Sequence, residues 1–208
     1  MSEPMDSKKC ILGVAAKLFA KLGLDKTSTR EIAKESKANI SLISYYFGGK
    51  EGLYKEVMRE FAIELKEHVN TNVFKVDDIT LTKENFSNEI LLIIKTIIFF
   101  RLKYPEISKI FSREKLTGLE HSKEIHEEIF YPMTLEFIKL IKKAQIEKIV
   151  NPNINPALFF TLMTESIWGF FAMAECPTPL AKDCVAITKD TTELAKQISE
   201  IYIQGVLL

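Results

Sequence analysis

The sequence is poor in the residues from which metal and catalytic sites are built. It has three histidines and three cysteines, and no two cysteines stand in a Cys-x-x-Cys pair. His121 and His126 are five residues apart, which does not place both side chains on one helix face, as two metal ligands require. Glycine-rich phosphate loops and nucleophile elbows are also missing. We therefore expect no enzyme, no metal site and no cofactor, and each histidine is most simply a surface or capping residue.

An excess of charge of either sign is absent as well, since 28 basic and 28 acidic residues cancel. The distribution is uneven, because residues 1–55 hold 10 Lys and Arg against 6 Asp and Glu, a net charge of +4, and the remainder holds 18 against 22, a net charge of −4. A basic segment attached to an acidic remainder suits a protein that docks one end onto phosphate.

No hydrophobic run is long enough to predict a membrane span. The most apolar run, residues 90–102, contains Lys95 and Arg101 and is too short to cross a bilayer. The polar start predicts no signal peptide, and three widely spaced cysteines suit free thiols in a reducing cytoplasm. We expect a cytoplasmic protein without a membrane partner; a thiol sensor built on Cys176 and Cys184 is the alternative use of the cysteines.

Apolar residues recur at spacings of three and four, and no segment alternates with a period of two, so the predicted fold is all-α. Residues 76–82 have the composition of a linker, and Pro132 should kink or split the helix in which it lies. Besides two short helices near residue 40, the sequence predicts helices over residues 7–22, 49–73, 83–104, 106–115, 121–148, 157–175 and 185–205.

Residues 27–54 predict two short helices joined by a tight turn. Ser28 and Glu31 have the spacing of a capping box at the start of the first helix. Asn39 is a good N-cap for the second helix, residues 40–47, and the glycines at 48–49 end it. A helix, a short turn and a second helix form the arrangement that places the second helix in a DNA major groove.

This stretch resembles the DNA-binding signature of the TetR-type transcriptional regulators. Lys37 replaces the glycine that the family usually has in the turn, so it would need a positive φ that costs about 1 kcal/mol. Ser44 stands where the family usually has a tyrosine facing the operator. The operator sequence of other family members therefore cannot be assigned to this chain. Residues 104–135 also resemble the CecR-like subgroup. The positions that match the family pattern are Thr29, Ile32, Ala33, Ile43, Tyr46, Phe47, Lys50, Glu51 and Leu53.

The resemblance implies a three-helix head, residues 1–53, that binds double-stranded operator DNA. Arg30 matches a position that reaches a base edge, whereas Thr29, Tyr46 and Lys50 match positions that contact phosphate. The alternative is a helical hairpin inside a core, with an ordinary solvated face on its second helix. The predicted DNA-binding residues are Thr29, Arg30, Asn39, Ile40, Ser41, Leu42, Ser44, Tyr45, Tyr46 and Lys50.

The resemblance also implies a larger helical body, residues 54–208, that dimerises and binds a ligand. Residues 157–175 are apolar on nearly all sides and residues 185–205 carry a continuous apolar seam, so a second copy would complete a four-helix interface. The alternative is that both helices line the core of one subunit. The predicted interface residues are Phe160, Trp168, Leu194, Ile198 and Ile201.

A hydrophobic small-molecule effector, anionic or aromatic, is the third predicted partner. Pro105 and Pro132 interrupt helices that would otherwise pack closely, and two arginines next to apolar residues would anchor a carboxylate. The alternative for each of these residues is ordinary core packing. The predicted ligand-binding residues are Phe99, Phe100, Arg101, Phe111, Arg113, Met133 and Phe137.

Together these patterns predict a homodimeric repressor released from its operator by a hydrophobic ligand, with activation instead of repression left open. The first rival is a helical small-molecule-binding or adaptor protein without DNA binding, which would lack salt-dependent affinity for duplex DNA. The second rival is an enzyme with a helical body, which a turnover assay would reveal.

Overall fold

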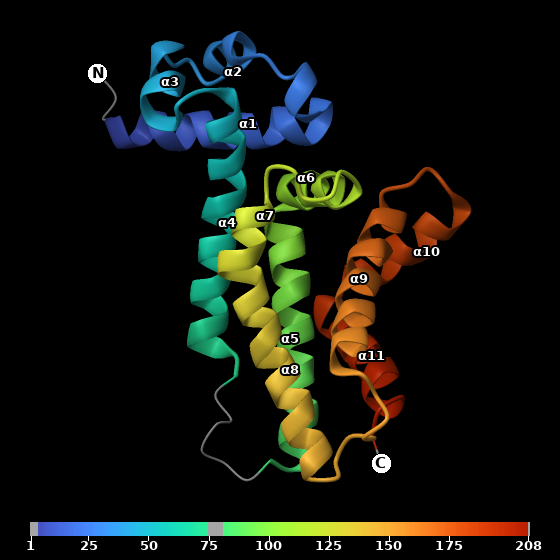
Figure 1. Cartoon of the computed structure of the whole chain (residues 1–208). Helices are drawn as coiled ribbons and strands as arrows, with labels where there is room; N and C mark the ends of the chain where they lie inside the picture. Colours follow the sequence, from blue (N-terminus) through green and yellow to red (C-terminus); the bar gives the residue numbers. More distant parts are fainter. Residues whose placement is uncertain (1–3, 75–80, 208) are drawn as a thin grey trace. The chain divides into compact units, whose positions relative to one another are not determined.

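The computed structural model describes residues 4–74 and 81–207, and within these ranges the elements are helices (Figure 1). The described residues include no strand, only an isolated bridge between Val150 and Leu207. The all-α prediction is confirmed, whereas most of the predicted linker, residues 76–82, lies outside the described residues. The elements are α1 (Pro4–Lys26), α2 (Thr29–Glu35), α3 (Ser41–Phe47), α4 (Lys50–Asn72), α5 (Lys83–Lys103), α6 (Pro105–Leu116), α7 (Lys123–Ile125), the π-helix η1 (His126–Phe130), α8 (Tyr131–Ile146), α9 (Pro156–Ala174), α10 (Pro179–Thr188) and α11 (Thr191–Gln204).

The chain divides into two compact units. The first unit comprises Met1–Leu65 and Tyr104–Phe130, and the second comprises Lys66–Lys103 and Tyr131–Leu208. Helix α4 therefore contributes residues to both units. The predicted boundary between residues 53 and 54 separates functions rather than compact units, and it stays a prediction.

In the first unit, α1 packs against α2, α3 and α6. Its fully buried side chains include Ile11 and Phe19, and the short helices add Ile32 and Ile43 to the same core. Figure 1 shows α2 and α3 beside α1. This small core holds the predicted second helix of the hairpin by one face only, which leaves its other face free.

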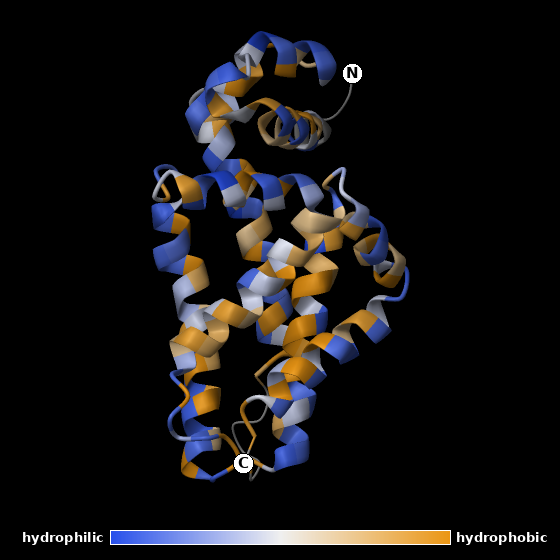
Figure 2. Cartoon of the chain, turned by 90° about the vertical axis from the view of Figure 1, so that its right-hand side faces the viewer, coloured by the Kyte–Doolittle hydropathy of each residue, from blue (hydrophilic) through white to orange (hydrophobic). Residues whose placement is uncertain are grey.

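In the second unit, α5 packs against α9 and α11, and α9 also packs against α8 and α10. The buried face of α5 includes Phe86, Ile90 and Ile94. Hydrophobic residues, orange in Figure 2, recur turn after turn along the helices of this unit. The near-continuous apolar character that the sequence shows in α5 is thus explained by packing against two other helices.

The predicted helix over residues 185–205 is wrong, because the structure forms two helices there. Helix α10 begins earlier, at Pro179, and the Thr178 side chain caps it by accepting from the Ala181 N–H. Helix α11 begins after Asp190, whose side chain accepts from the N–H groups of Thr192 and Glu193 at 3.0 and 2.9 Å. An Asp cap stabilises a helix start by about 1 kcal/mol. The cap at Asp190 therefore determines where α11 begins, although the apolar pattern continues across this position.

Pro132 splits its helix, as predicted. The five residues before α8, His126–Phe130, form a π-helix instead of an α-helix. Proline has no N–H to donate to the carbonyl group four residues back, and its ring collides with that carbonyl in a regular α-helix. The wider π turn accommodates both effects.

Gly52 makes the connection between α3 and α4 possible, because a Cβ atom at this position would overlap the carbonyl oxygen of Phe47. That oxygen belongs to rigid backbone, so we expect Gly52→Ala to destabilise the protein by about 2 kcal/mol or more. Gly13 lies inside α1 with no atom near the position of an added Cβ. The matched control Gly13→Ala should instead stabilise by about 0.5–1 kcal/mol. Urea unfolding curves of the two variants check this, and equal midpoints would contradict it.

Candidate nucleic-acid interface

Helix α2 has the predicted serine cap and the turn after it has the predicted positive φ, whereas the Glu31 half of the capping box stays a prediction. The Ser28 Oγ accepts from the Arg30 N–H at 3.2 Å and caps α2. Lys37 has the predicted positive φ, 54°, in the turn. The Ala38 N–H donates to the Ala33 carbonyl at 3.0 Å, which closes the turn against the buried end of α2. A residue with a side chain therefore occupies the left-handed position at which the family usually has glycine.

Helix α3 begins at Ser41, one residue later than predicted, and Asn39 still caps it. The Asn39 Oδ1 accepts from both the N–H and the hydroxyl of Ser41, at 3.0 and 2.9 Å. The helix ends at Gly48, which has a φ of 70° and donates its N–H to the Ser44 carbonyl. Both ends of α3 are thus held by local hydrogen bonds that the sequence predicts.

The two faces of α3 differ in burial as predicted. Ile43 and Phe47 are buried against the core of the first unit, whereas Ser41 and Ser44 are exposed. Tyr45 is 79% exposed. A short helix that presents hydroxyl groups and an aromatic ring suits contacts with base edges and phosphate groups.

Lys50 is the first residue of α4 and lies next to the end of α3 in the chain. Its Nζ donates to the Asp25 carbonyl at 3.2 Å, which leaves further N–H donors of the ammonium group for other acceptors. The first N–H groups of an α-helix also attract anions. Lys50 and the start of α4 together can therefore bind a phosphate group.

The structure brings the other predicted DNA-binding residues to this part of the first unit. Thr29 and Arg30 begin α2, and Arg30 is exposed. Ile40 is exposed before α3, whereas Leu42 and Tyr46 of α3 are partly buried. All ten predicted residues thus come from α2, α3, the turn between them and the first residue of α4.

Two basic residues of the hairpin were missed as candidates. Lys34 and Lys37 are exposed and flank the end of α2. The signal that would have found them is the charge of the hairpin alone, because residues 26–50 hold five Lys and Arg against two Glu. This excess favours contact with a polyanion.

Glu114 of α6 joins α4 and the segment before α7 inside the first unit. Its carboxylate is buried and accepts from the Tyr54 hydroxyl at 3.1 Å and from the N–H groups of His121 and Ser122 at 2.9 and 3.0 Å. Burial, followed by the nearby Glu114 carboxylate, raises the pKa of Tyr54. Tyr54 consequently stays a hydroxyl donor over the pH range in which proteins fold.

Both predicted arginine anchors have a protein partner in the structure. The Arg113 Nη1 donates to the Phe19 carbonyl at 2.6 Å and thereby attaches α6 to α1. Arg101 is buried in the second unit, where it pairs with Glu175 at 2.7 Å and lies over the Phe171 ring. These contacts give both arginines a structural role, and their role as ligand anchors stays a prediction.

The apolar residues of the predicted ligand site are distributed over the two units. Phe111 belongs to the first unit, whereas Phe100 and Phe137 are buried in the second. Phe99 is exposed and stacks on His68, and Met133 is partly buried. Core packing accounts for Phe100 and Phe137, and their role as ligand contacts stays a prediction.

The predicted dimer residues fall into two groups. Leu194 is 3% exposed and lies on α11, which packs against α5, so packing within one subunit accounts for its burial and its place in the interface stays a prediction. Phe160, Trp168 and Ile198 are partly buried. Ile201 is 70% exposed and remains a candidate.

The structure adds exposed apolar residues that sequence reasoning missed, namely Leu158 and Leu162 of α9. The Tyr202 hydroxyl lies 2.9 Å from the Leu162 carbonyl oxygen, so α11 meets α9 beside Ile201. By length and composition α9 would also be apolar enough to cross a membrane, although core helices of soluble proteins pass the same test. A partner-free α9 therefore presents a largely apolar face.

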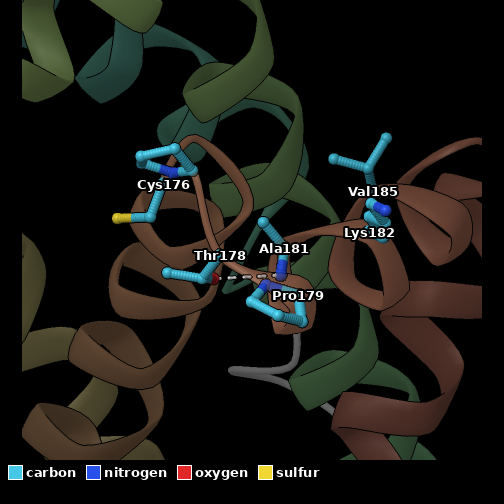
Figure 3. Close-up of a pocket in the computed structure, with 7 residues that line it drawn as sticks. Cys176, Thr178, Pro179, Ala181, Lys182 and Val185 are labelled. Atoms are coloured by element: carbon cyan, nitrogen blue, oxygen red, sulfur yellow. Dashed lines mark hydrogen bonds between the residues drawn. The ribbon is translucent and has the colours of Figure 1, made fainter.

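A pocket between α9 and α10, shown in Figure 3, lies apart from the predicted ligand residues in the chain. Its lining combines the Cys176 thiol and the Lys182 side chain with prolines and small apolar groups. The Ala181 N–H donates to the Thr178 Oγ1 at 3.3 Å, and both residues line the pocket. Among residues 4–74 and 81–207, no three His, Cys, Asp or Glu side chains gather as metal ligands.

Comparison with known proteins identifies the first unit's helical hairpin. Residues 11–57 match the family model described as "Bacterial regulatory proteins, tetR family". The "Probable HTH-type transcriptional regulator YttP" of Bacillus subtilis (strain 168) is 27% identical over 110 residues, which cover 53% of this chain and 51% of that protein. The "HTH-type transcriptional dual regulator CecR" of Shigella flexneri is 27% identical over 141 residues, which cover 65% of this chain and 63% of that protein. The matched segments thus span about half to two thirds of these relatives.

Solved structures extend the likeness of the fold to nearly the whole chain. The ketosteroid transcriptional regulator KstR2 of Mycobacterium tuberculosis has a TM-score of 0.72 at 16% identity, with coverage of 97% of this chain and 95% of that one. At this identity the likeness concerns the fold alone. The match of residues 11–57 to the family model and the likeness to these regulators together support a TetR-type regulator.

Proposed function

We propose that this chain is a ligand-responsive transcriptional regulator of the cytoplasm that binds operator DNA as a homodimer and is released by a hydrophobic small molecule. The observation that carries the proposal is the exposed polar face of α3 next to the lysine-bearing start of α4, within the segment that matches the family.

Recognition of DNA would divide between two kinds of contact. Arg30, exposed at the start of α2, would reach a base edge, where arginine pairs best with guanine. Lys50 and the N–H groups of α4 would hold a phosphate group, which positions the head without reading sequence. Tyr45 on the outer face of α3 adds an aromatic surface in the groove.

A homodimer would cover the apolar face that α9 and α11 present. Leu158, Leu162 and Ile201 are exposed on these helices, and an apolar patch of this kind marks an interaction surface. Two heads in one dimer would also reach two half-sites, which lie about 34–36 Å or a multiple of that distance apart.

The two kinds of DNA contact predict two different phenotypes. Arg30→Ala should cost about 1–3 kcal/mol and relax the preference at one base pair, whereas Lys50→Ala should weaken binding to all sequences and reduce the salt slope by about one. Duplexes selected from a random pool, titrated at several salt concentrations, measure both effects. The control is Lys142→Ala, an exposed residue of α8. If neither Arg30→Ala nor Lys50→Ala changes affinity, the docking arrangement is wrong.

The proposed dimer predicts that charges on its apolar face separate the subunits. Leu162→Glu combined with Ile201→Glu should give monomers that bind an operator weakly, because two carboxylates would be buried without partners at the interface. Ile146→Glu is the matched control, since Ile146 of α8 is 78% exposed and lies outside the proposed face. Sedimentation velocity checks the assembly. A double variant that remains dimeric would move the interface to another surface.

A further inference from the structure

Two buried polar atoms in the first unit have no hydrogen-bond partner. Within residues 4–74 and 81–207, Ser122 Oγ and His126 Nε2 are the buried side-chain nitrogen and oxygen atoms left in this state, and Ser122 is 0% exposed. Leaving a buried polar atom unsatisfied costs about 1–3 kcal/mol. Atoms of this kind are expected to have a partner in the working protein.

A backbone hydrogen bond brings Ser122 and His126 within one turn of each other. Ser122 and His126 are four residues apart, and the His126 N–H donates to the Ser122 carbonyl at 2.9 Å. The Ser122 N–H is used as well, because it donates to the Glu114 carboxylate at 3.0 Å. With its backbone groups occupied, Ser122 has only its hydroxyl left for a further partner.

Aromatic rings surround the imidazole of His126. The rings of Phe111 and Phe130 lie 6.0 and 4.9 Å from it, centroid to centroid, and 5.2 Å from each other. Phe61 of α4 meets Phe111 at 5.8 Å. These phenylalanines come from three different elements of the first unit, so they form an aromatic wall beside the imidazole.

His126 is also the first residue of the π-helix that Pro132 imposes. A π turn is costly and appears most often where a helix serves a function, because it shifts side chains from their regular positions. His126 therefore lies in the irregular π turn, whereas Ser122 lies four residues earlier, just before α7.

The protonation state of His126 limits the kind of ligand that could bind to its Nε2 atom. Burial, followed by the positive charge of Lys115, lowers the pKa of His126, and the carboxylate of Glu114 acts in the opposite direction. The imidazole is therefore neutral at physiological pH and offers Nε2 as a donor or an acceptor. A neutral ring near the buried Glu114 carboxylate disfavours an anionic partner.

We propose that Ser122 and His126 bind the hydroxyl group of a phenol-like aromatic effector whose ring packs against Phe111 and Phe130. A hydroxyl group donates one hydrogen bond and accepts others, so it satisfies a serine hydroxyl and a neutral imidazole in either tautomer. This inference rests on the proposed ligand-responsive function and names the class of its effector. A single buried water molecule is the competing occupant.

The test measures binding of three probes to the full chain without DNA. Calorimetric titrations use 4-ethylphenol, ethylbenzene, which lacks the hydroxyl group, and 4-ethylbenzoate, which carries a negative charge. We expect 4-ethylphenol to bind at least about tenfold more tightly than either of the others, because one or two buried hydrogen bonds are worth about this factor. Equal affinities for 4-ethylphenol and ethylbenzene would overturn the proposal, as would a complete lack of 4-ethylphenol binding, which would leave water as the occupant.

Variants locate the binding. Ser122→Ala and His126→Phe keep the size of each side chain and should each weaken 4-ethylphenol binding by about fivefold to tenfold, with no change for ethylbenzene. Ser112→Ala and His68→Phe are the matched controls, since the Ser112 hydroxyl already donates to the Ser108 carbonyl and His68 packs on Phe99 in the second unit. Circular dichroism confirms that each variant folds. Unchanged 4-ethylphenol affinity in both folded variants would place the ligand elsewhere.

A separate titration of the wild-type chain with selected duplexes keeps this inference distinct from the proposed function. Binding of 4-ethylphenol that weakens DNA affinity supports both. Binding of 4-ethylphenol at Ser122 and His126 without any DNA affinity would refute the regulator and leave the ligand site standing. DNA affinity without 4-ethylphenol binding would support the regulator and refute the ligand site.

Discussion

The buried carboxylate of Glu114 is the constraint on which the first unit depends. A buried charge without partners costs several kcal/mol or more, so its acceptor positions must be filled by groups held in place. The Tyr54 hydroxyl fills one from α4, and two backbone N–H groups at His121 and Ser122 fill others. Tyr54 in turn meets the ring of Phe19 edge to face at 5.0 Å. One carboxylate thereby ties the position of α6 to α4, α7 and the core of α1.

The same helix carries the means of coupling a ligand to the head. Arg113, next to Glu114, donates to the Phe19 carbonyl of α1, and Phe111 contributes to the aromatic wall around His126. The proposed effector site and the proposed DNA-binding face thus belong to one compact unit, connected through α6. A ligand there changes DNA binding only if it binds the two states of this unit with different affinity. We expect such a difference in ligand affinity to act first on the hydrogen bonds of α6.

The second unit buries a charged side chain and leaves apolar side chains exposed on its surface. Its interior buries Arg101 only because Glu175 and the ring of Phe171 surround the guanidinium group. Its outside leaves leucines of α9 and Ile201 of α11 in contact with water. An exposed apolar patch of this kind marks an interaction surface. A second copy would cover it, which is why the dimer belongs to the proposed function.

The sequence by itself determined the hairpin and the helix boundaries that depend on local signals. Ser28, Asn39 and Gly48 act on backbone groups a few residues away, so their effects can be predicted without knowing any tertiary contact. Only the tertiary structure decided that Arg113 joins α6 to α1, that Leu194 is buried within one subunit, and which polar atoms stay unsatisfied. Periodicity shows which face of a helix is apolar, but not which helix covers it. The partners of Arg113 and Glu114 lie 94 and 60 residues away, and contacts at that range are set by packing alone.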